Sequence, residues 1–265
     1  MTIRVHREGG VAFLSIDRPE RRNALAGPQW TALGEQARQL AADPKLRAVI
    51  LHGQGEHFCA GMDLNPDNPL IAQVGQAIFG HDRDAGVAVI RGLKADLAAL
   101  GSLPVPLIVA VEGACAGGGL EVALRGDLIV ASTQAWFSLP ETRVGMVPDV
   151  GGSTLLTRKV GAANASYLAL SGRRITADQA LRWGLVQELC EPGQALQAAK
   201  ALAADICKAG PQATRLALRA LRQAAVLPLE KSLEHETQRG ADALVSGEVP
   251  VGIAAFAQRK DPQWT

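Results

Sequence analysis

The chain has 265 residues, of which 48% are hydrophobic, so it can fill the core of one large domain and is not expected to be disordered. Its 27 Lys and Arg residues against 26 Asp and Glu residues leave no global field that would attract nucleic acid or an anionic membrane. The four cysteines form no CxxC pair and have no histidine at metal-ligand spacing, so neither a metal site nor a disulfide framework is expected.

The N-terminal sequence MTIRVHREGG is charged and lacks the apolar run of a secretory signal. Further along, the longest apolar stretch is interrupted by Pro104, Pro106, Glu112 and Glu121, so no membrane-spanning segment is expected. These features predict a soluble, cytoplasmic protein with no membrane partner.

The first part of the chain alternates predicted strands and helices. Residues 11–16, 48–51 and 107–111 are predicted strands, and a helix is expected to begin near Pro28. Residues 65–86, rich in Pro and Asn, are expected to be irregular, and a helix with apolar residues at helical spacing follows over 87–100. The segments LRAVIL, PLIVAV and DLIVA are almost continuously apolar, which is typical of parallel strands covered by helices on both faces. The pattern predicts an α/β fold.

After residue 160 the pattern is mainly helical. Thr176 is the predicted N-cap of a helix over 177–183 that ends at Gly184, and LVQEL is a predicted last strand. Helices are then expected over 194–208, 212–224, 228–244 and 253–260. We therefore divide the chain into a core domain, residues 1–192, and a C-terminal helical region, residues 193–265, suited to packing or oligomerisation.

The run Gly117-Gly118-Gly119 follows a predicted strand and begins a helix. Amide groups at such a helix start have no acceptor within the helix, and they can donate to a developing negative oxygen. A tight turn without a ligand is the structural alternative. Glu121 lies one turn further on in an apolar stretch, where a carboxylate is costly unless it is paired, exposed or functional. We interpret this segment as part of an active site.

Two further segments carry candidate residues. In HFCAGMDL, the amide of Met62 is a possible second donor where the chain turns into a helix, although a simple glycine turn would explain the same residues. In FSLPETRVGMVPDVGGS, Glu141 and Asp149 lie in a rigid loop. Glu141 could be an ordinary loop acid, and Asp149 could be the N-cap of a helix beginning near Val150.

Cys59 and Cys115 lie close to these loops in the sequence and are candidate nucleophiles by position. Neither has an obvious base beside it, and small buried cysteines are common. Burial in the core is therefore the favoured interpretation of both.

Four segments in order, HFCAGMDL, PLIVAVEGACAGGGLEVALRGDLIVAS, FSLPETRVGMVPDVGGSTLLTRKVG and LSGRRITADQALRWGLVQEL, together resemble the crotonase superfamily, also called the enoyl-CoA hydratase/isomerase family. RPERRNAL and FAQRK extend the resemblance towards both ends. It implies a crotonase-like α/β spiral of repeated ββα turns with a C-terminal helical region, assembled as a homotrimer or as a hexamer of two trimers.

The resemblance also implies an acyl-CoA substrate whose thioester oxygen is held by the amides of Met62 and Gly118, an oxyanion hole that stabilises enolate character. In the hydratases of the family, two glutamates hold a water that adds across a C2–C3 double bond, and the matching residues are Glu121 and Glu141. Glu121 would help activate the water at C3, and Glu141 would exchange a proton at C2. Coenzyme A is then part of the substrate, and no metal or redox cofactor is required.

Contacts to the nucleotide part of coenzyme A are implied for a wider set of residues. Most lie in the two segments around residues 22–25 and 60–64, and one lies near the C-terminus and would reach a neighbouring subunit. The set comprises Arg22, Ala24, Ala60, Asp63, Leu64 and Lys260.

Asp149 departs from the hydratase pattern, which usually has a small residue there. Dienoyl-CoA isomerases of the same superfamily carry acids at all three positions and a long excursion after the AGxDL segment, although they usually have aspartate in place of Glu121. A CoA-thioester hydrolase is a third possibility, since that branch has acids resembling Glu141 and Asp149.

A catalytically inactive binding protein stays open as another class. Some crotonase-like proteins bind RNA, and Arg215, Arg219 and Arg222 could form a basic strip on a helix. At helical spacing a solvated face is the favoured interpretation of that strip. The balanced charge and the intact acid pair argue against nucleic-acid binding.

Overall fold

A six-stranded sheet lies at the centre of the computed structural model, which describes residues 2–264. The first two strands pair antiparallel, and all later neighbours in the sheet pair parallel. In spatial order the strands are β1 (Ile3–Glu8), β2 (Val11–Ile16), β3 (Ala48–Gly53), β4 (Leu107–Val111), β6 (Leu128–Ser132) and β9 (Glu188–Cys190). The predicted α/β class with a largely parallel sheet is confirmed.

Both faces of this sheet are buried, which explains the continuous apolar runs. In β3, Ala48 and Ile50 lie in one hydrophobic cluster with α7 (Ala195–Lys208). The side chains of Val49 and Leu51 point to the opposite face of the sheet. They lie in the other cluster, with α1 (Gly27–Ala41) and α3 (Arg83–Gly101). Because alternate residues of one strand reach two separate cores, neither face tolerates a polar residue easily.

A smaller sheet, β5 (Ala114–Ala116), β7 (Trp136–Ser138) and β8 (Arg174–Thr176), accompanies the large one. β4 enters the large sheet and β5 the small one before α4 (Gly118–Ala123), and β6 and β7 repeat this order before α5 (Thr157–Ser171). Between β7 and α5 lie two short helical turns, η2 (Glu141–Val144) and η3 (Gly152–Leu156). These successive ββα units agree with the predicted spiral, and each unit brings a loop to the same region.

The prediction of an irregular segment over residues 65–86 is wrong. The chain forms α2 (Pro69–Phe79) there, and α3 begins at Arg83. The Asn68 side chain accepts the N–H of Leu70, and Asp82 caps α3 in the same way. The Pro and Asn residues that resemble loop chemistry are therefore helix-start residues, because proline is favoured at a first helical position.

The chain after residue 160 is mainly helical, as predicted. Thr176 caps α6 (Ala177–Arg182) in a reciprocal capping box with Gln179, and Gly184 has φ +75° after the helix. α8 (Pro211–Ala224) and α9 (Leu229–Leu244) lie close to the expected ranges. α10 (Glu248–Ala257) begins five residues before the expected start, because Pro250 occupies its first turn, where no helical N–H bond is needed.

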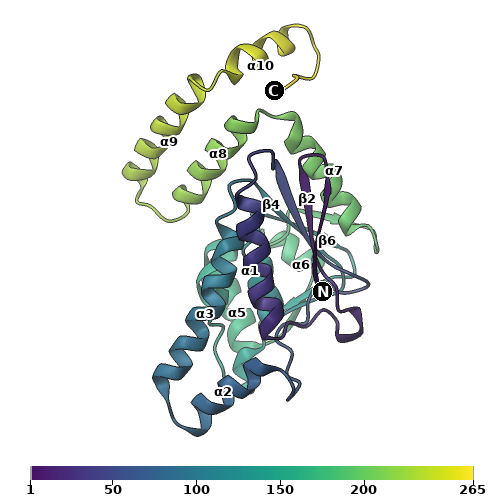
Figure 1. The fold of residues 1–265 in the computed structure, drawn as a ribbon, viewed down its shortest axis with the longest axis vertical. Coiled ribbons are helices and arrows are strands. Elements are labelled where there is room, and N and C mark those ends of the chain that lie inside the picture. Colours follow the sequence, from purple (N-terminus) through teal and green to yellow (C-terminus); the bar gives the residue numbers. More distant parts are fainter. Residues whose placement is uncertain (1, 265) are drawn as a thin grey trace.

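Helices α8, α9 and α10 project from one end of the molecule, and α2 lies at the other end (Figure 1). Among the described residues, no single helix is long and apolar enough to cross a membrane. Only α9 and α10 taken together meet that criterion by length and composition, and they are bent by 74° relative to each other.

Two of the three arginines in the predicted basic strip attach α8 to the body of the protein. Arg222 forms two hydrogen bonds to the Asp127 carboxylate, at 2.8 and 2.7 Å, and a third to the carbonyl of Leu103. Arg215 donates to backbone carbonyls of the segment before β3. The interpretation of the strip as a solvated face is wrong for these two residues, because their guanidinium groups replace water with protein acceptors.

Candidate active site

The start of α4 presents backbone amides from a glycine turn. Gly117 has φ 54° and ψ −128°, a conformation that residues with a Cβ rarely adopt, and Gly118 is the first residue of the helix. Gly119 packs directly on a neighbouring segment, since a Cβ there would lie 2.3 Å from the carbonyl oxygen of Cys59. Glycines therefore allow this turn to approach the chain around Cys59.

That neighbouring segment carries the second predicted donor, the amide of Met62. Leu25 holds the chain on both sides of it: its N–H donates to Gly61 O at 2.8 Å, and its carbonyl accepts the Asp63 N–H at 2.9 Å. The Met62 nitrogen lies 3.7 Å from the position a Cβ on Gly118 would take. Within residues 2–264, the N–H groups of Met62 and Gly118 find no hydrogen-bond acceptor. The fold thus brings two unpaired amide donors together.

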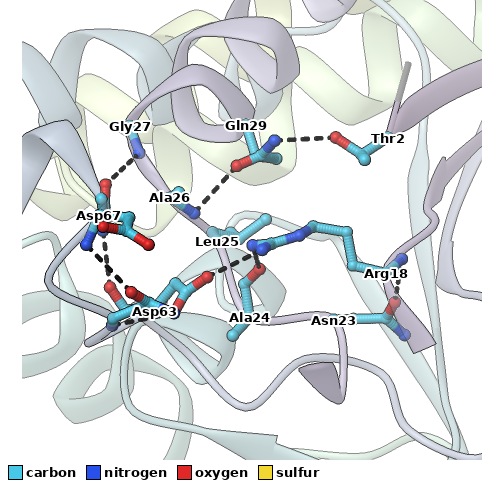
Figure 2. Close-up of polar contacts among 12 residues, drawn as sticks. Thr2, Arg18, Asn23, Ala24, Leu25, Ala26, Gly27, Gln29, Asp63 and Asp67 are labelled. Carbon is cyan, nitrogen blue, oxygen red and sulfur yellow. Dashed lines mark hydrogen bonds and ion pairs between the residues drawn. The ribbon is translucent and has the colours of Figure 1, made fainter. Parts of the chain in front are cut away.

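A polar network fixes the segment that follows Met62 (Figure 2). The Arg18 guanidinium donates to the Asp63 carboxylate at 2.8 Å and to the Ala24 carbonyl at 2.6 Å. The Asn68 side chain donates to Asp63 O and accepts the Gly27 N–H, at 2.6 and 3.0 Å. The expectation that the chain turns into a helix at Met62 is wrong, because these contacts hold an irregular segment up to the start of α2.

Glu121 is the most enclosed of the three predicted acids, with 2% of its surface exposed. Its Oε1 accepts the N–H groups of Val150 and Gly152 at 2.8 and 2.7 Å. Its pKa is raised to about 7: burial is the main cause, the nearby carboxylates of Glu141 and Asp149 act in the same direction, and the two N–H donors oppose them. A carboxyl group with this pKa can both accept and release a proton near neutrality.

Glu141 is the first residue of η2, and its carboxyl group lies against the glycine turn, with Oε1 3.1 Å from the position of a Cβ on Gly117. Its Oε2 is buried with no hydrogen-bond partner among the described residues. Burial raises its pKa, and the Asp149 carboxylate acts in the same direction. The structure therefore places a second perturbed carboxyl group beside the first, although it comes from a different ββα unit.

Asp149 completes a cluster of three acids. Burial raises its pKa, whereas its own backbone N–H and the Lys94 ammonium group on α3 lower it. The interpretation of Asp149 as an N-cap is wrong: η3 begins at Gly152 with no side-chain cap, and the amides of Val150 and Gly152 bond to Glu121 instead. Asp149 is therefore not committed to capping the following turn.

The residues predicted to contact coenzyme A do not form one cluster in the chain. Ala60 N–H donates to the Arg22 carbonyl, so Arg22, Ala24 and Ala60 lie in adjoining segments, and Leu64 is 70% exposed nearby. The Asp63 carboxylate is buried and paired with Arg18. Lys260 follows α10, and α10 lies at the opposite end of the molecule from α2 (Figure 1).

Two residues of this region were not singled out from the sequence. Asn68 links the starts of α1 and α2 to the Met62 segment, and its position directly before Pro69 was the available N-cap signal. Arg125 donates to the Val150 carbonyl at 2.5 Å, and the available signal was an arginine four residues after Glu121 in an otherwise apolar stretch.

The cysteines near the site are buried, as favoured from the sequence. Cys59 and Cys115 face each other in an isolated parallel bridge, and both have no exposed surface. Burial raises the pKa of the Cys59 thiol to about 12 and raises that of Cys115 as well. Both thiols are therefore protonated and poor nucleophiles at neutral pH. Over residues 2–264, no group of three His, Cys, Asp or Glu side chains is placed to hold a metal ion.

Comparison with known proteins gives a consistent result over the whole chain. The sequence pattern described as enoyl-CoA hydratase/isomerase matches residues 6–265. A 1,2-epoxyphenylacetyl-CoA isomerase from Escherichia coli (strain K12) is 34% identical over 260 residues, which cover 98% of this chain and 97% of the relative. A carnitinyl-CoA dehydratase from Salmonella arizonae is 34% identical over 272 residues, which cover 99% of this chain and 98% of the relative.

Solved structures agree with the sequence relatives. The crystal structure of an enoyl-CoA hydratase from Polaromonas sp. JS666 superimposes with a TM-score of 0.89 at 32% identity, over 99% of both chains. The relatives named here differ in reaction, since they comprise an isomerase, a dehydratase and a hydratase.

Proposed function

The chain belongs to the enoyl-CoA hydratase/isomerase family, the crotonase superfamily, and from this premise we propose that it adds water across the C2–C3 double bond of a 2-enoyl-CoA thioester. The observation that carries the proposal is the pair of buried carboxyl groups, Glu121 and Glu141, next to two unpaired amides. A structural core has no use for this arrangement, because each buried carboxyl group reduces stability. Buried carboxyl groups with shifted pKa values are, however, typical of sites where acid–base chemistry takes place.

In the proposed reaction the amides of Met62 and Gly118 donate to the thioester oxygen, which becomes negative as water adds. Glu121 takes a proton from the water while the water oxygen bonds to C3, and Glu141 delivers a proton to C2. The two carboxyl groups interact, so they titrate as a pair and not as independent sites. Charge stabilisation by the amides is strongest where the site excludes water.

Double-bond isomerisation of a dienoyl-CoA is the second candidate. Asp149 favours it, because its carboxylate lies with the two glutamates and is not used as a helix cap. The relative named as an isomerase is consistent with this candidate. Isomerisation needs proton removal and return at two carbons, for which a third acid would be useful.

The two candidates are separated by assaying purified protein with crotonyl-CoA and with a 3,5-dienoyl-CoA. We expect loss of the enoyl absorbance with the first substrate. Glu121→Gln and Glu141→Gln should each lower kcat by about 10²- to 10⁴-fold, the usual contribution of a general acid or base. Asp149→Asn should stay within a few-fold of the parent protein.

Other outcomes are equally informative. Gain of a conjugated diene without hydration, together with an inactive but folded Asp149→Asn variant, would establish the isomerase instead. Full activity of both glutamine variants would reject the proposed acid pair. RNA retention without turnover of any thioester would favour a binding protein.

We also propose that the chain self-associates as a trimer, or as a hexamer of two trimers, through the projecting C-terminal helices. The support is a set of exposed apolar side chains on and between α8, α9 and α10. The set comprises Leu221, Val226, Leu229, Leu233, Leu244, Val245, Ile253 and Phe256. Neither α9 nor α10 has a buried residue, which is costly for helices of this composition in a free chain.

A further inference from the structure

Arg125 follows α4 and reaches the loop that faces the acid cluster. Its Nη2 donates to the Val150 carbonyl at 2.5 Å and lies 2.8 Å from the position a Cβ on Gly151 would take. Gly151 has φ +121°, a backbone conformation that favours glycine. The guanidinium group therefore lies directly against this loop.

The same short loop is held from its other side by Glu121, whose Oε1 accepts the N–H groups of Val150 and Gly152. Glu121 and Arg125, which are four residues apart, thus bind consecutive peptide groups of one loop. The carboxylate of Glu121 accepts from N–H groups of the loop, and the guanidinium of Arg125 donates to a C=O group. Asp149 directly precedes this loop in the chain. Displacing the loop would change both the solvation of Glu121 and the position of Asp149.

Arg125 also interacts electrostatically with Glu121. Burial lowers the pKa of Arg125, whereas the charge of Glu121 raises it, and such an interaction is mutual. The Nε of Arg125 is buried with no partner among the described residues. Asp149 and Glu141 face Glu121 from the other elements of the site, and both are acidic.

Other charged groups line the cavity of about 980 Å³ behind Arg125. Asp127 is paired with Arg222, and Lys159 on α5 interacts with those two and donates to the Gly126 carbonyl at 2.9 Å. Arg158, on the same helix, donates to the Ala225 carbonyl. The contacts of these groups lie away from the 150–152 loop, so Arg125 is distinguished by its contacts with that loop and its interaction with Glu121.

We propose that Arg125 is a positioning residue for the acid cluster: it holds the 150–152 loop so that the loop amides meet Glu121 and favour its ionised carboxylate. The inference rests on the proposed function for its kinetic consequence, because an ionised Glu121 is the form that accepts a proton from water. The Arg125 contact with the loop and the hydrogen bonds from the loop to Glu121 are features of this chain and do not depend on which of the two reactions takes place.

The test combines kinetics with direct titration of Glu121. Arg125→Met should lower kcat by about 10- to 100-fold with KM changed less than about threefold, because misplaced groups affect the reacting geometry more than binding. The acid limb of the pH profile of kcat/KM should move up by about 0.5 to 1 pH unit. The Glu121 carboxyl carbon, followed by ¹³C NMR with Glu121→Gln to assign the signal, should titrate at a correspondingly higher pH.

Arg125→Lys should recover part of both effects, since it keeps the charge but not the planar group. Lys159→Met is the matched control: it removes another half-buried cation that lines the same cavity, and it should leave the NMR titration and the pH profile unchanged. If Arg125→Met does not fold, Arg125→Lys carries the test through the same two measurements, with a smaller expected shift.

An unchanged Glu121 titration in the folded Arg125 variants would overturn the inference, as would an equal shift in Lys159→Met. A loss of kcat with no shift in either pH measurement would reduce Arg125 to a packing role and would also overturn it. If the parent protein turns over neither thioester, the proposed function fails, and the NMR titration still decides the role of Arg125.

Discussion

Glu121 shows at the scale of a single residue how burial and hydrogen bonding oppose each other. Its carboxyl group is almost fully enclosed, yet two amides donate to one oxygen. Burial has the larger effect, and the pKa rises from an ordinary value of 4.5 to about 7. The folded protein therefore binds this proton more tightly than the unfolded chain does.

The linkage between proton binding and folding predicts a pH-dependent stability difference. A raised pKa stabilises the fold below about pH 4.5 relative to higher pH, and this advantage is lost between pH 4.5 and 7. Glu121→Gln removes the ionisation, so its free energy of unfolding relative to the parent should increase by about 1 to 3 kcal/mol between pH 5 and pH 8. Urea unfolding at the two pH values measures this. A difference that does not vary with pH would contradict the predicted burial of the charge.

At the scale of secondary-structure elements, Asn68 connects three separate pieces of chain. Its carbonyl oxygen accepts the N–H groups of Gly27 and Leu70, at the starts of α1 and α2, and its amide donates to the Asp63 carbonyl. The side chain is 3% exposed, so water cannot readily replace these partners. One cap residue thus fixes two helix starts and the segment carrying the Met62 amide.

Asn68→Ala should lower the free energy of unfolding by about 2 to 3 kcal/mol, because it leaves two helix-start amides and a buried carbonyl without partners. The control is Asn65→Ala, whose side chain only accepts the N–H of Asp67 in an exposed turn. That variant should lie within about 0.5 kcal/mol of the parent protein. Urea unfolding at constant pH compares the two, and equal losses would argue against the proposed role of Asn68.

At the scale of the whole molecule, the body and the projecting helices differ in how they are stabilised. The body has two large hydrophobic clusters on the two faces of the sheet. Arg222 and Arg215 attach α8 to the body, and the Glu248 carboxylate of α10 accepts the N–H groups of Gln212 and Ala213 at the start of α8. The apolar side chains of α9 and α10 therefore remain exposed in the single chain.

Phe256→Arg should weaken the proposed self-association, because the Phe256 side chain on α10 is 86% exposed and a charge there would oppose burial in an interface. Light scattering after size-exclusion chromatography should show the parent as a trimer or hexamer and the variant shifted towards smaller species. Phe79→Arg is the control, since Phe79 is also 86% exposed but lies on α2 at the opposite end. A monomeric parent protein would reject the assembly.

Much of the fold could be predicted from local sequence. The predicted strands over 11–16 and 107–111 coincide with β2 and β4, because continuous apolar runs record burial on both faces. The Thr176 cap was also predictable, because its partner, Gln179, lies within the same turn. The family resemblance, confirmed over nearly the whole chain, rested on motifs that are likewise continuous in sequence.

The sequence by itself therefore determined the fold class, the family and the residue types available for chemistry. Only the tertiary structure decided which groups pair. Glu121 accepts the N–H groups of Val150 and Gly152, which lie 29 and 31 residues away in the sequence. From the sequence, Asp149 was the expected cap of the turn that contains these N–H groups. The prediction of an irregular segment over residues 65–86 was wrong for a related reason. Asn68 caps α2 and also accepts the N–H group of Gly27, which lies 41 residues earlier in the sequence. A side chain's own sequence context shows what it can donate or accept, whereas its partner is set by which loops the fold brings together.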